Sequence, residues 1–181
     1  MRSLTVGLMI VILSGVAFAQ SPAAPNALYA EFLGNGLLYS CNYDRLFSES
    51  FGGRIGVSYT FPEGVSIVTL PVMAYYLVGL GSGPSKLEFG LGATILLQPE
   101  RQSLSFMAAP DDQLRGTSVL GTATVGYRYQ RADGGLIIRV GATPFFGQFS
   151  REINPSPSTP EEYEDVFRFQ IFGGISIGYG F

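Results

Sequence analysis

The chain has 181 residues and a formal net charge of −3, with 14% charged residues, 24 Gly, 14 Phe, 10 Tyr and neither His nor Trp. Its length is that of one domain. The negative charge argues against nucleic acid as a partner, and charged residues are scarcer than the roughly 25% of soluble globular domains. Because no apolar run of about 20 residues follows the N-terminal segment, further helical membrane spans are excluded.

The first 19 residues have the parts of a secretory signal peptide. A positive residue near the start precedes an apolar core over Leu4–Leu13, and an Ala-Phe-Ala sequence ends the segment. These features predict cleavage before Gln20 and export from the cytoplasm, whereas the alternative is a retained N-terminal anchor helix. We therefore expect a signal peptide over 1–19, a short linker over 20–26 and one domain over 27–181.

Beyond the linker, large apolar residues alternate with small or polar ones at a period of two. This period is the signal of a β-strand, and no stretch shows a helical period. The pattern predicts strands, in chain order, over Phe51–Phe61, Ser66–Gly79, Lys86–Leu97, Thr117–Gln130, Gly134–Phe146 and Phe167–Phe181, of which the second is the least regular and the last the clearest. Pro71 lies inside the second of them and demands a bulge or a gap in the hydrogen-bond ladder.

The segment Ala27–Phe47 could form one long strand or two strands joined at Asn35-Gly36, which is a two-residue hairpin signal. If the strands form a membrane barrel with both chain ends on one side, their number must be even. Splitting the segment gives eight strands instead of seven. The sequence therefore predicts an all-β fold, an eight-stranded antiparallel up-and-down transmembrane β-barrel.

The predicted connections alternate in length. Short turns over Ser48–Ser50, Leu80–Ser85 and Arg131–Asp133 fit the periplasmic side, and the long polar segments Gln98–Gly116 and Gly147–Val166 fit loops that face outward. Short outward loops are expected at Asn35-Gly36 and at Phe61–Gly64. The acidic residues within Ser150–Val166 could bind divalent cations or a basic partner, or could simply be a solvated loop.

The pattern alone leaves open which face meets lipid. A soluble lipocalin-like barrel in the periplasm would turn the apolar face inward to bind a lipid. Three observations favour lipid outside: the polar face is rich in Gly, which suits the crowded interior of eight strands, it lacks the dense Lys and Glu of a soluble surface, and the chain ends in Phe181. Aromatic residues near the strand ends would then form girdles at the two interfaces.

The chain ends in Tyr-Gly-Phe, with apolar residues at alternate positions, namely Phe181, Tyr179, Ile177 and Ile175. This ending resembles the C-terminal signal of Gram-negative outer-membrane barrels. The domain as a whole is similar to the small eight-stranded barrels of the OmpA/OmpX type, and the stretch Asn35–Arg45 resembles an uncharacterised group of such barrels. The resemblance implies a monomer in outer-membrane lipid that is recognised by the barrel assembly machinery.

With the apolar face outward, the inward face carries charged residues of both signs. Unpaired charges in so narrow a lumen would be costly, so we expect them to form salt bridges and to plug the barrel against solute flow. The alternative interpretation is a gated ion path. The predicted lumenal ionic cluster is Glu31, Asp44, Arg54, Glu88, Arg128, Arg139 and Arg168.

No residue pattern in the chain predicts catalysis. The absence of His removes the side chain whose unperturbed pKa best suits a general base near neutrality. No nucleophile elbow, phosphate loop or Cys/His metal cluster appears, so no catalytic residue, metal or cofactor is predicted. We therefore expect a structural or surface-interaction role, with two alternatives: a narrow pore or carrier with a pocket near Phe145, Phe172 and Thr94, or the soluble lipid binder.

Overall fold

The computed structural model describes residues 24–60, 67–97, 112–113, 118–152 and 163–181, and these residues form β-strands and turns. The strands are β1 (Asn26–Phe32), β2 (Tyr39–Leu46), β3 (Phe51–Thr60), β4 (Ile67–Gly79), β5 (Ser85–Leu97), β6 (Asp112–Gln113), β7 (Ser118–Gln130), β8 (Gly135–Glu152) and β9 (Tyr163–Gly180). Within the described ranges, no helix is long and apolar enough to cross a membrane.

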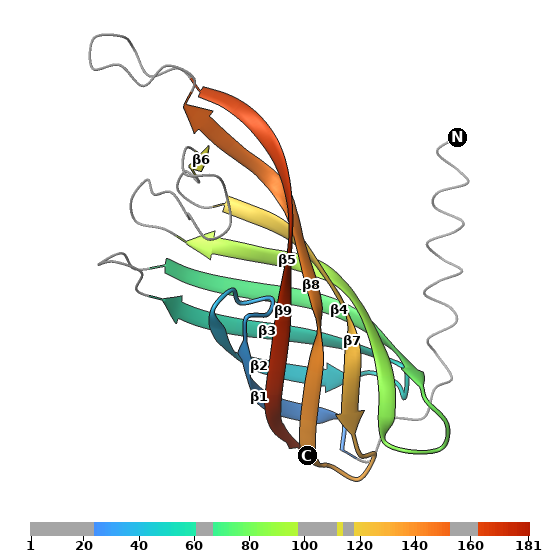
Figure 1. The fold of residues 1–181 in the computed structure, drawn as a ribbon. Helices are drawn as coiled ribbons and strands as arrows, with labels where there is room; N and C mark the ends of the chain where they lie inside the picture. Colours follow the sequence, from blue (N-terminus) through green and yellow to red (C-terminus); the bar gives the residue numbers. More distant parts are fainter. Residues whose placement is uncertain (1–23, 61–66, 98–111, 114–117, 153–162) are drawn as a thin grey trace, which may run out of the picture.

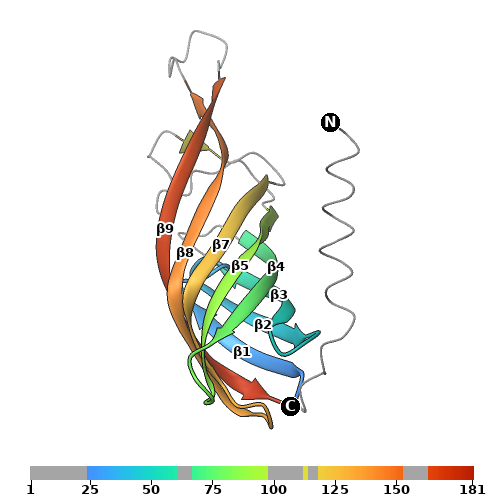
Figure 2. The ribbon, with the colours of Figure 1, turned by 90° about the vertical axis from the view of Figure 1, so that its right-hand side faces the viewer.

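Eight long strands close an antiparallel up-and-down barrel (Figures 1 and 2). Each long strand pairs with the next along the chain, β5 pairs with β7, and β9 returns to pair with β1. The two-residue β6 only extends the sheet beside the far end of β8. The predicted fold class is confirmed, and so is the division of residues 27–47 into two strands.

The two ends of the barrel differ in their connections. We call the end with Phe47–Ser50, Leu80–Pro84 and Arg131–Gly134 the turn end, because these short segments join its strands there. Gly134, with a φ of +94°, supports the last of them, since a left-handed backbone favours glycine. The opposite end, which carries the longer connections, is called the loop end.

The two faces of the sheet have opposite character, as the alternating sequence predicts. On β9 the outward side chains are large and apolar, for example Ile175 at 54% exposure, whereas Ser176 beside it is 2% exposed. The buried inward face instead holds Arg, Glu, Asp, Asn, Ser and Thr. The barrel therefore has an apolar outside and a polar inside, which is the reverse of a soluble ligand-binding barrel.

Inward glycines make room for the large side chains of neighbouring strands. A Cβ on Gly178 would lie 2.2 Å from Cβ of Tyr29, and one on Gly52 would lie 2.2 Å from the Tyr75 hydroxyl. Since the interior of an eight-stranded barrel is only just wide enough for side chains, these glycines decide where an aromatic ring can enter the lumen.

Pro71 interrupts one ladder, as the sequence predicts. The register of β3 with β4 runs from Phe51–Tyr76 to Ile55–Val72 and resumes at Ser58–Thr69, so two residue pairs are skipped, of which one contains Pro71. On its other side, β4 pairs with β5 without a break. Because a residue's N–H points to only one side of its strand, the missing N–H of proline interrupts only one of the two ladders.

The last two strands are longer than the sequence predicts. The sequence predicts a loop over Gly147–Val166, but β8 continues to Glu152 and β9 begins at Tyr163. The pairing of β8 with β7 ends at Phe146 and that of β9 with β1 ends at Ile175, so beyond these points the two strands form a hairpin that projects past the barrel (Figures 1 and 2). Apolar and polar residues no longer alternate regularly in this part of the chain, so the sequence pattern does not predict that β8 and β9 extend this far.

The connection between β1 and β2 is also different from the prediction. Instead of a two-residue turn at Asn35-Gly36, six residues (Leu33–Leu38, here called the lumenal loop) join the strands. The left-handed backbone lies at Leu33 and Leu37, with φ of 56° and 75°. Asn35 is fully buried, so the lumenal loop enters the barrel and is not a short outward loop.

Candidate functional site

The centre of the lumen holds a network of buried charges, placed there by inward positions on six strands. Glu88 on β5 contacts three guanidinium groups: its Oε1 lies 2.6 Å from both Arg54 Nη2 and Arg139 Nη2, and its Oε2 lies 3.2 Å from Arg128 Nη1. The Glu88 and Arg54 side chains are at most 1% exposed. Charge-assisted bonds of this kind are roughly twice as strong as neutral ones.

Asp44 on β2 is the second anion of the network. Its carboxylate lies 3.0 Å from Arg128 Nη1 and 3.6 Å from Arg54 Nε, and it accepts a hydrogen bond from the Tyr75 hydroxyl. Arg128 is held further by Gln130, whose Oε1 accepts from Arg128 Nε at 2.8 Å. Asp44 therefore joins two cations to one aromatic side chain.

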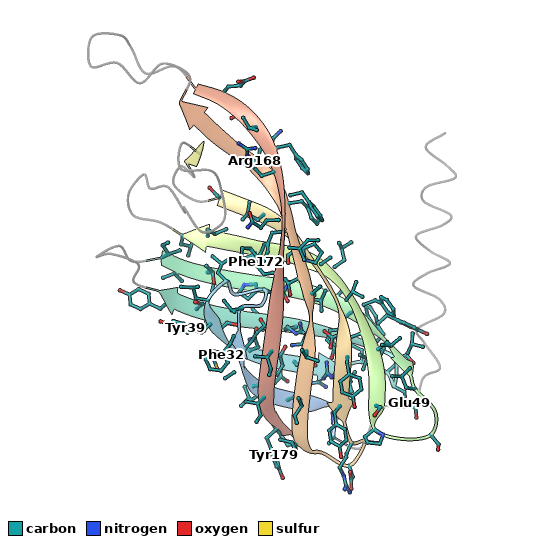
Figure 3. The ribbon with its side chains drawn as sticks, viewed as in Figure 1. Phe32, Tyr39, Glu49, Arg168, Phe172 and Tyr179 are labelled. Atoms are coloured by element: carbon teal, nitrogen blue, oxygen red, sulfur yellow. The ribbon has the colours of Figure 1, made fainter. Side chains whose placement is uncertain are left out.

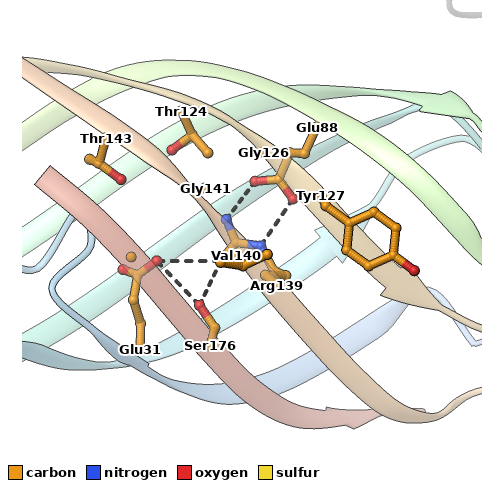
Figure 4. Close-up of a pocket in the computed structure, with 11 residues that line it drawn as sticks. Glu31, Glu88, Thr124, Gly126, Tyr127, Arg139, Val140, Gly141, Thr143 and Ser176 are labelled. Atoms are coloured by element: carbon orange, nitrogen blue, oxygen red, sulfur yellow. Dashed lines mark hydrogen bonds and ion pairs between the residues drawn. The ribbon is translucent and has the colours of Figure 1, made fainter. Parts of the chain in front are cut away.

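Glu31 on β1 completes the network at the side nearer the loop end. Its Oε1 lies 3.4 Å from Arg139 Nη1 and 3.4 Å from Ser176 Oγ. Figure 4 shows Glu31, Arg139 and Ser176 turned toward one another. A cavity of about 10 Å³ borders Glu31, Glu88 and Arg139, which is room for about one water molecule. The lumen at this level is therefore filled by side chains.

The charges of the network balance. Three carboxylates (Glu31, Asp44, Glu88) face three guanidinium groups (Arg54, Arg128, Arg139), and we call these six residues the ionic network. Two rings pack against the cations: Tyr75 lies 5.0 Å from Arg128 and Tyr29 lies 5.1 Å from Arg139. A tyrosine ring attracts a cation at this distance, so the rings stabilise the guanidinium groups that water no longer reaches.

The lumenal loop fills the next level toward the loop end through neutral hydrogen bonds. The Asn35 amide donates to Thr122 Oγ1 at 2.7 Å and accepts from Thr124 Oγ1 at 3.1 Å. Its backbone oxygen accepts from Thr94 Oγ1 at 2.8 Å, and Thr69 Oγ1 donates to the neighbouring Gly36 oxygen at 3.1 Å. Asn35 thereby ties the loop to β5 and β7.

Glu31 also connects the lumenal loop to the ionic network. The Asn35 backbone N–H donates to Glu31 Oε2 at 3.0 Å, while the other carboxylate oxygen lies beside Arg139. Glycines give the loop its space: a Cβ on Gly34 would lie 2.1 Å from Glu31 Cδ, and one on Gly174 would lie 3.1 Å from the Gly34 Cα. The loop fits because these positions lack side chains.

The structure brings six of the seven residues of the predicted cluster into the ionic network and leaves Arg168 outside it. Arg168 is half-buried and pairs in register with Gly147, in the part of the hairpin beyond the barrel (Figure 3). The alternation along β9 predicts on which face of the sheet Arg168 lies, but it does not predict how far along the barrel axis the residue lies. Glu31 lies closer to the lumenal loop than its five partners do.

Several residues of the site were missed by the sequence analysis. Tyr29 and Tyr75 occupy inward positions, and alternation could have placed them there, whereas their rings' contacts with arginines depend on which strands lie opposite. The four threonines that hold the lumenal loop also alternate inward, but the loop's own course had no signal in the sequence. The residues suggested for a carrier pocket are themselves packed: Phe145 is 2% exposed beside Phe172, with ring centroids 5.6 Å apart, and Thr94 holds Asn35.

The chemistry of the site is that of a structural core. Its carboxylates are each bonded to guanidinium, hydroxyl or backbone N–H groups, so none is placed as a general base toward an open cavity. Among the described residues, no group of three or more His, Cys, Asp or Glu is placed to hold a metal ion. Three buried side-chain atoms in that part of the chain lack a hydrogen-bond partner: Tyr29 Oη, Asn42 Oδ1 and Arg54 Nε, which lies 3.6 Å from Asp44.

Comparison with known proteins gives a match in structure and none in sequence. No family model matches the chain. No curated protein matches it either. The chain is similar to the N-terminal β-barrel domain of Pseudomonas aeruginosa OprF, with a TM-score of 0.57 and 10% identity, over 90% of this chain and 100% of that one. The fold is therefore the closed eight-stranded antiparallel β-barrel that this domain of OprF also has.

Proposed function

We propose that the protein is an integral outer-membrane barrel with a closed lumen, exported by its signal peptide and lying in the membrane as a monomer. The observation that carries the proposal is a broad apolar outer face around a buried, charge-balanced interior. Side chains such as Leu91 and Val119, at 65% and 62% exposure, would be costly in water and are suited to hydrocarbon. The proposal assigns no catalysis to the barrel.

Orientation follows from the connections. The short turns of the turn end suit the periplasm, and the longer connections of the loop end suit the cell exterior. Tyr179 lies outward at the turn end with 63% exposure (Figure 3). Phe181, at 52% exposure, ends the same face, where an aromatic girdle would meet the inner interface. Ile177 and Ile175 continue this face along β9, and we propose this face as the part read by the outer-membrane assembly machinery.

Two stacked closures support a barrel that passes no solutes. The ionic network fills the lumen at one level and the lumenal loop fills the next, with Asn35 and Arg128 both fully buried. An ion crossing the lumen would have to displace several charge-assisted bonds at once, which is costly in a low dielectric. We therefore propose a plug and not the narrow pore or carrier.

Separation of inner and outer membranes tests the location, and planar-bilayer recording tests the closure. The processed protein should appear in the outer-membrane fraction, require detergent for extraction and migrate faster on SDS gels before heating than after it. The pure protein should give no large, steady conductance. Recovery without detergent would overturn the membrane assignment, and steady conductance would overturn the plug.

The projecting β8–β9 hairpin favours a surface-interaction role as a second function. Beyond Ile175 the pairing of β9 with β1 ends, while β9 continues to pair with β8 up to Tyr163. A strand edge and two outward rings, Phe167 and Phe169 at 64% and 61% exposure, therefore extend past the barrel. Exposed strand edges and apolar patches are common sites of contact between proteins.

Surface proteolysis of intact cells tests this second function. The hairpin should be cleaved within residues 153–162, and a variant lacking residues 148–166 should keep its outer-membrane location while losing contacts made at the cell surface. Protection from protease in intact cells, with cleavage only after lysis, would place the loop end in the periplasm and overturn both the orientation and this role.

A further inference from the structure

A second hollow, apart from the ionic network, opens at the turn end of the barrel. It has a volume of about 530 Å³, which is within the range of small-molecule sites. Leu46 and Leu77, both nearly fully buried, line it together with Ala24, whose N–H donates to the Ala132 oxygen at 3.1 Å. The N-terminal end of the described chain thus crosses this mouth and helps to form an apolar wall.

Lys86 lines this hollow and is a cation that does not belong to the charge-balanced ionic network. Lys86 pairs in register with Arg128, so two cations lie directly opposite on neighbouring strands, an arrangement that is unfavourable in a sheet. Arg128 is already neutralised by Asp44 and Glu88. In the part of the chain that the structure describes, the Lys86 ammonium forms no ion pair.

Three other polar or charged residues, Gln130, Glu49 and Arg131, also line the hollow. Gln130 lines it and uses its Oε1 to accept from Arg128, so its amide N–H groups are not taken by that contact. Glu49 lies at the rim and attracts Lys86 from a distance (Figure 3). Arg131 also lines the hollow, but its charge is met by Asp133 at 2.7 Å.

We propose that this hollow is a binding site for a small carboxylate that carries a short hydrocarbon chain. The carboxylate lies at Lys86 with the Gln130 amide beside it, and the chain lies along the part of the wall that Ala132 and Gly79 expose. An anion there offsets the repulsion between Lys86 and Arg128, and the hydrocarbon covers the exposed surface that Ala132 and Gly79 contribute to the hollow. The proposal goes beyond the closed barrel, since ligand enters only the mouth and does not cross it.

The test is titration of the protein in lipid nanodiscs with hexanoate, followed by calorimetry and by the NMR shifts of the glycine amides at 79, 81 and 83. Saturable binding is expected for hexanoate and not for hexan-1-ol, which has the chain without the charge. Lys86→Met should weaken binding at least about tenfold, whereas Lys86→Arg should retain it. Lys86→Met removes a like-charge contact, so the variant is expected to fold, and faster migration before heating checks this.

Two further arms sharpen the result. Glu49→Gln removes a competing anion at the rim and should strengthen hexanoate binding by about two- to threefold. A series from butanoate to decanoate distinguishes the source of the ligand: tightest binding at a short chain indicates a soluble acid, and affinity that rises to the longest chain indicates an acid derived from lipid. Absence of saturable binding, or equal binding by Lys86→Met, would overturn the proposal and leave the closed barrel untouched.

Discussion

The two levels of the lumen are closed by different physical means. Near the barrel centre, six charged side chains from six strands meet in a balanced ionic network. One level further toward the loop end, a single connection of the chain enters the barrel and is held by neutral hydrogen bonds with threonines. Glu31 touches both levels.

The two closures should therefore differ in how much stability is lost when one of their side chains is replaced. Removing one member of a buried charge network leaves an uncompensated charge, and that costs far more than the pair contributed. Removing one neutral hydrogen bond costs only the desolvation of the group left behind. The ionic network should therefore dominate the stability of the barrel, and the lumenal loop should govern how tightly the loop end is sealed.

The largest effect is expected from Glu88→Gln. Glu88 contacts all three arginines of the network, so the variant leaves one excess positive charge buried among them. The free energy of unfolding should fall by about 3–5 kcal/mol, a range typical of broken buried pairs. Urea unfolding of the protein refolded in lipid vesicles measures it.

The matched control is Asp133→Asn, which removes a carboxylate from an ion pair of similar geometry at the exposed turn end. Because water and salt screen that pair, the variant should show no measurable loss of stability. Equal effects of the two variants would show that burial of the ionic network does not matter.

The second effect is the coupling between Glu88 and Arg139. Arg139→Met alone leaves an excess negative charge, but together with Glu88→Gln it leaves two carboxylates facing two guanidinium groups. The double variant should be more stable than the sum of the single losses by about 2–3 kcal/mol. A double-mutant cycle of unfolding free energies gives this value, and strict additivity would contradict a network that acts through charge balance.

The contrast between the two levels also explains what the sequence could predict. Alternation placed Asp44, Arg54 and Glu88 on the inward face, and since an unpaired charge inside eight strands is so costly, their meeting followed from the fold. Arg168 has the same parity, but it lies in the hairpin beyond the barrel. The period of two determines whether a residue faces the lumen or the outside. Its position along the barrel axis depends on the lengths of the neighbouring strands.

The lumenal loop could not be predicted in the same way. Asn35-Gly36 is a local hairpin signal, and it predicts a turn in which those two residues take left-handed backbone. In the structure, tertiary hydrogen bonds with Thr94 and Thr122 hold Asn35 in the lumen, and Leu33 and Leu37 take the left-handed backbone instead. Contacts between residues far apart in the chain outweigh the local preference.

Asn35→Ala tests the neutral level and should have a smaller effect than either change in the ionic network. It removes the bonds to Thr122 and Thr124 and leaves their hydroxyl groups without the Asn35 amide. The expected loss is about 1–3 kcal/mol in the free energy of unfolding, together with faster modification of a cysteine placed at Thr94 by a thiol reagent added from the loop end.

Two further variants serve as the control: the single variant Thr122→Val and the double variant Asn35→Ala/Thr122→Val. Since both single changes remove the same 2.7 Å bond, the double variant should lose less than their sum. Unchanged reactivity of the cysteine at position 94 in Asn35→Ala would mean that the lumenal loop does not seal the loop end.

The smallest effect, and the most specific, is expected from Gly174→Ala. The new Cβ would lie 3.1 Å from the Gly34 Cα, so the lumenal loop must move by a few tenths of an ångström while the ionic network keeps its contacts. Stability should change by no more than about 1 kcal/mol, yet the Asn35 amide, which donates to Glu31 at 3.0 Å, should exchange its hydrogen faster. Gly173→Ala is the control, because its Cβ meets nothing within 4 Å. If both variants leave the exchange of the Asn35 amide unchanged, the contact with β9 does not restrain the lumenal loop. The position of the loop is then determined by its hydrogen bonds with the threonines alone.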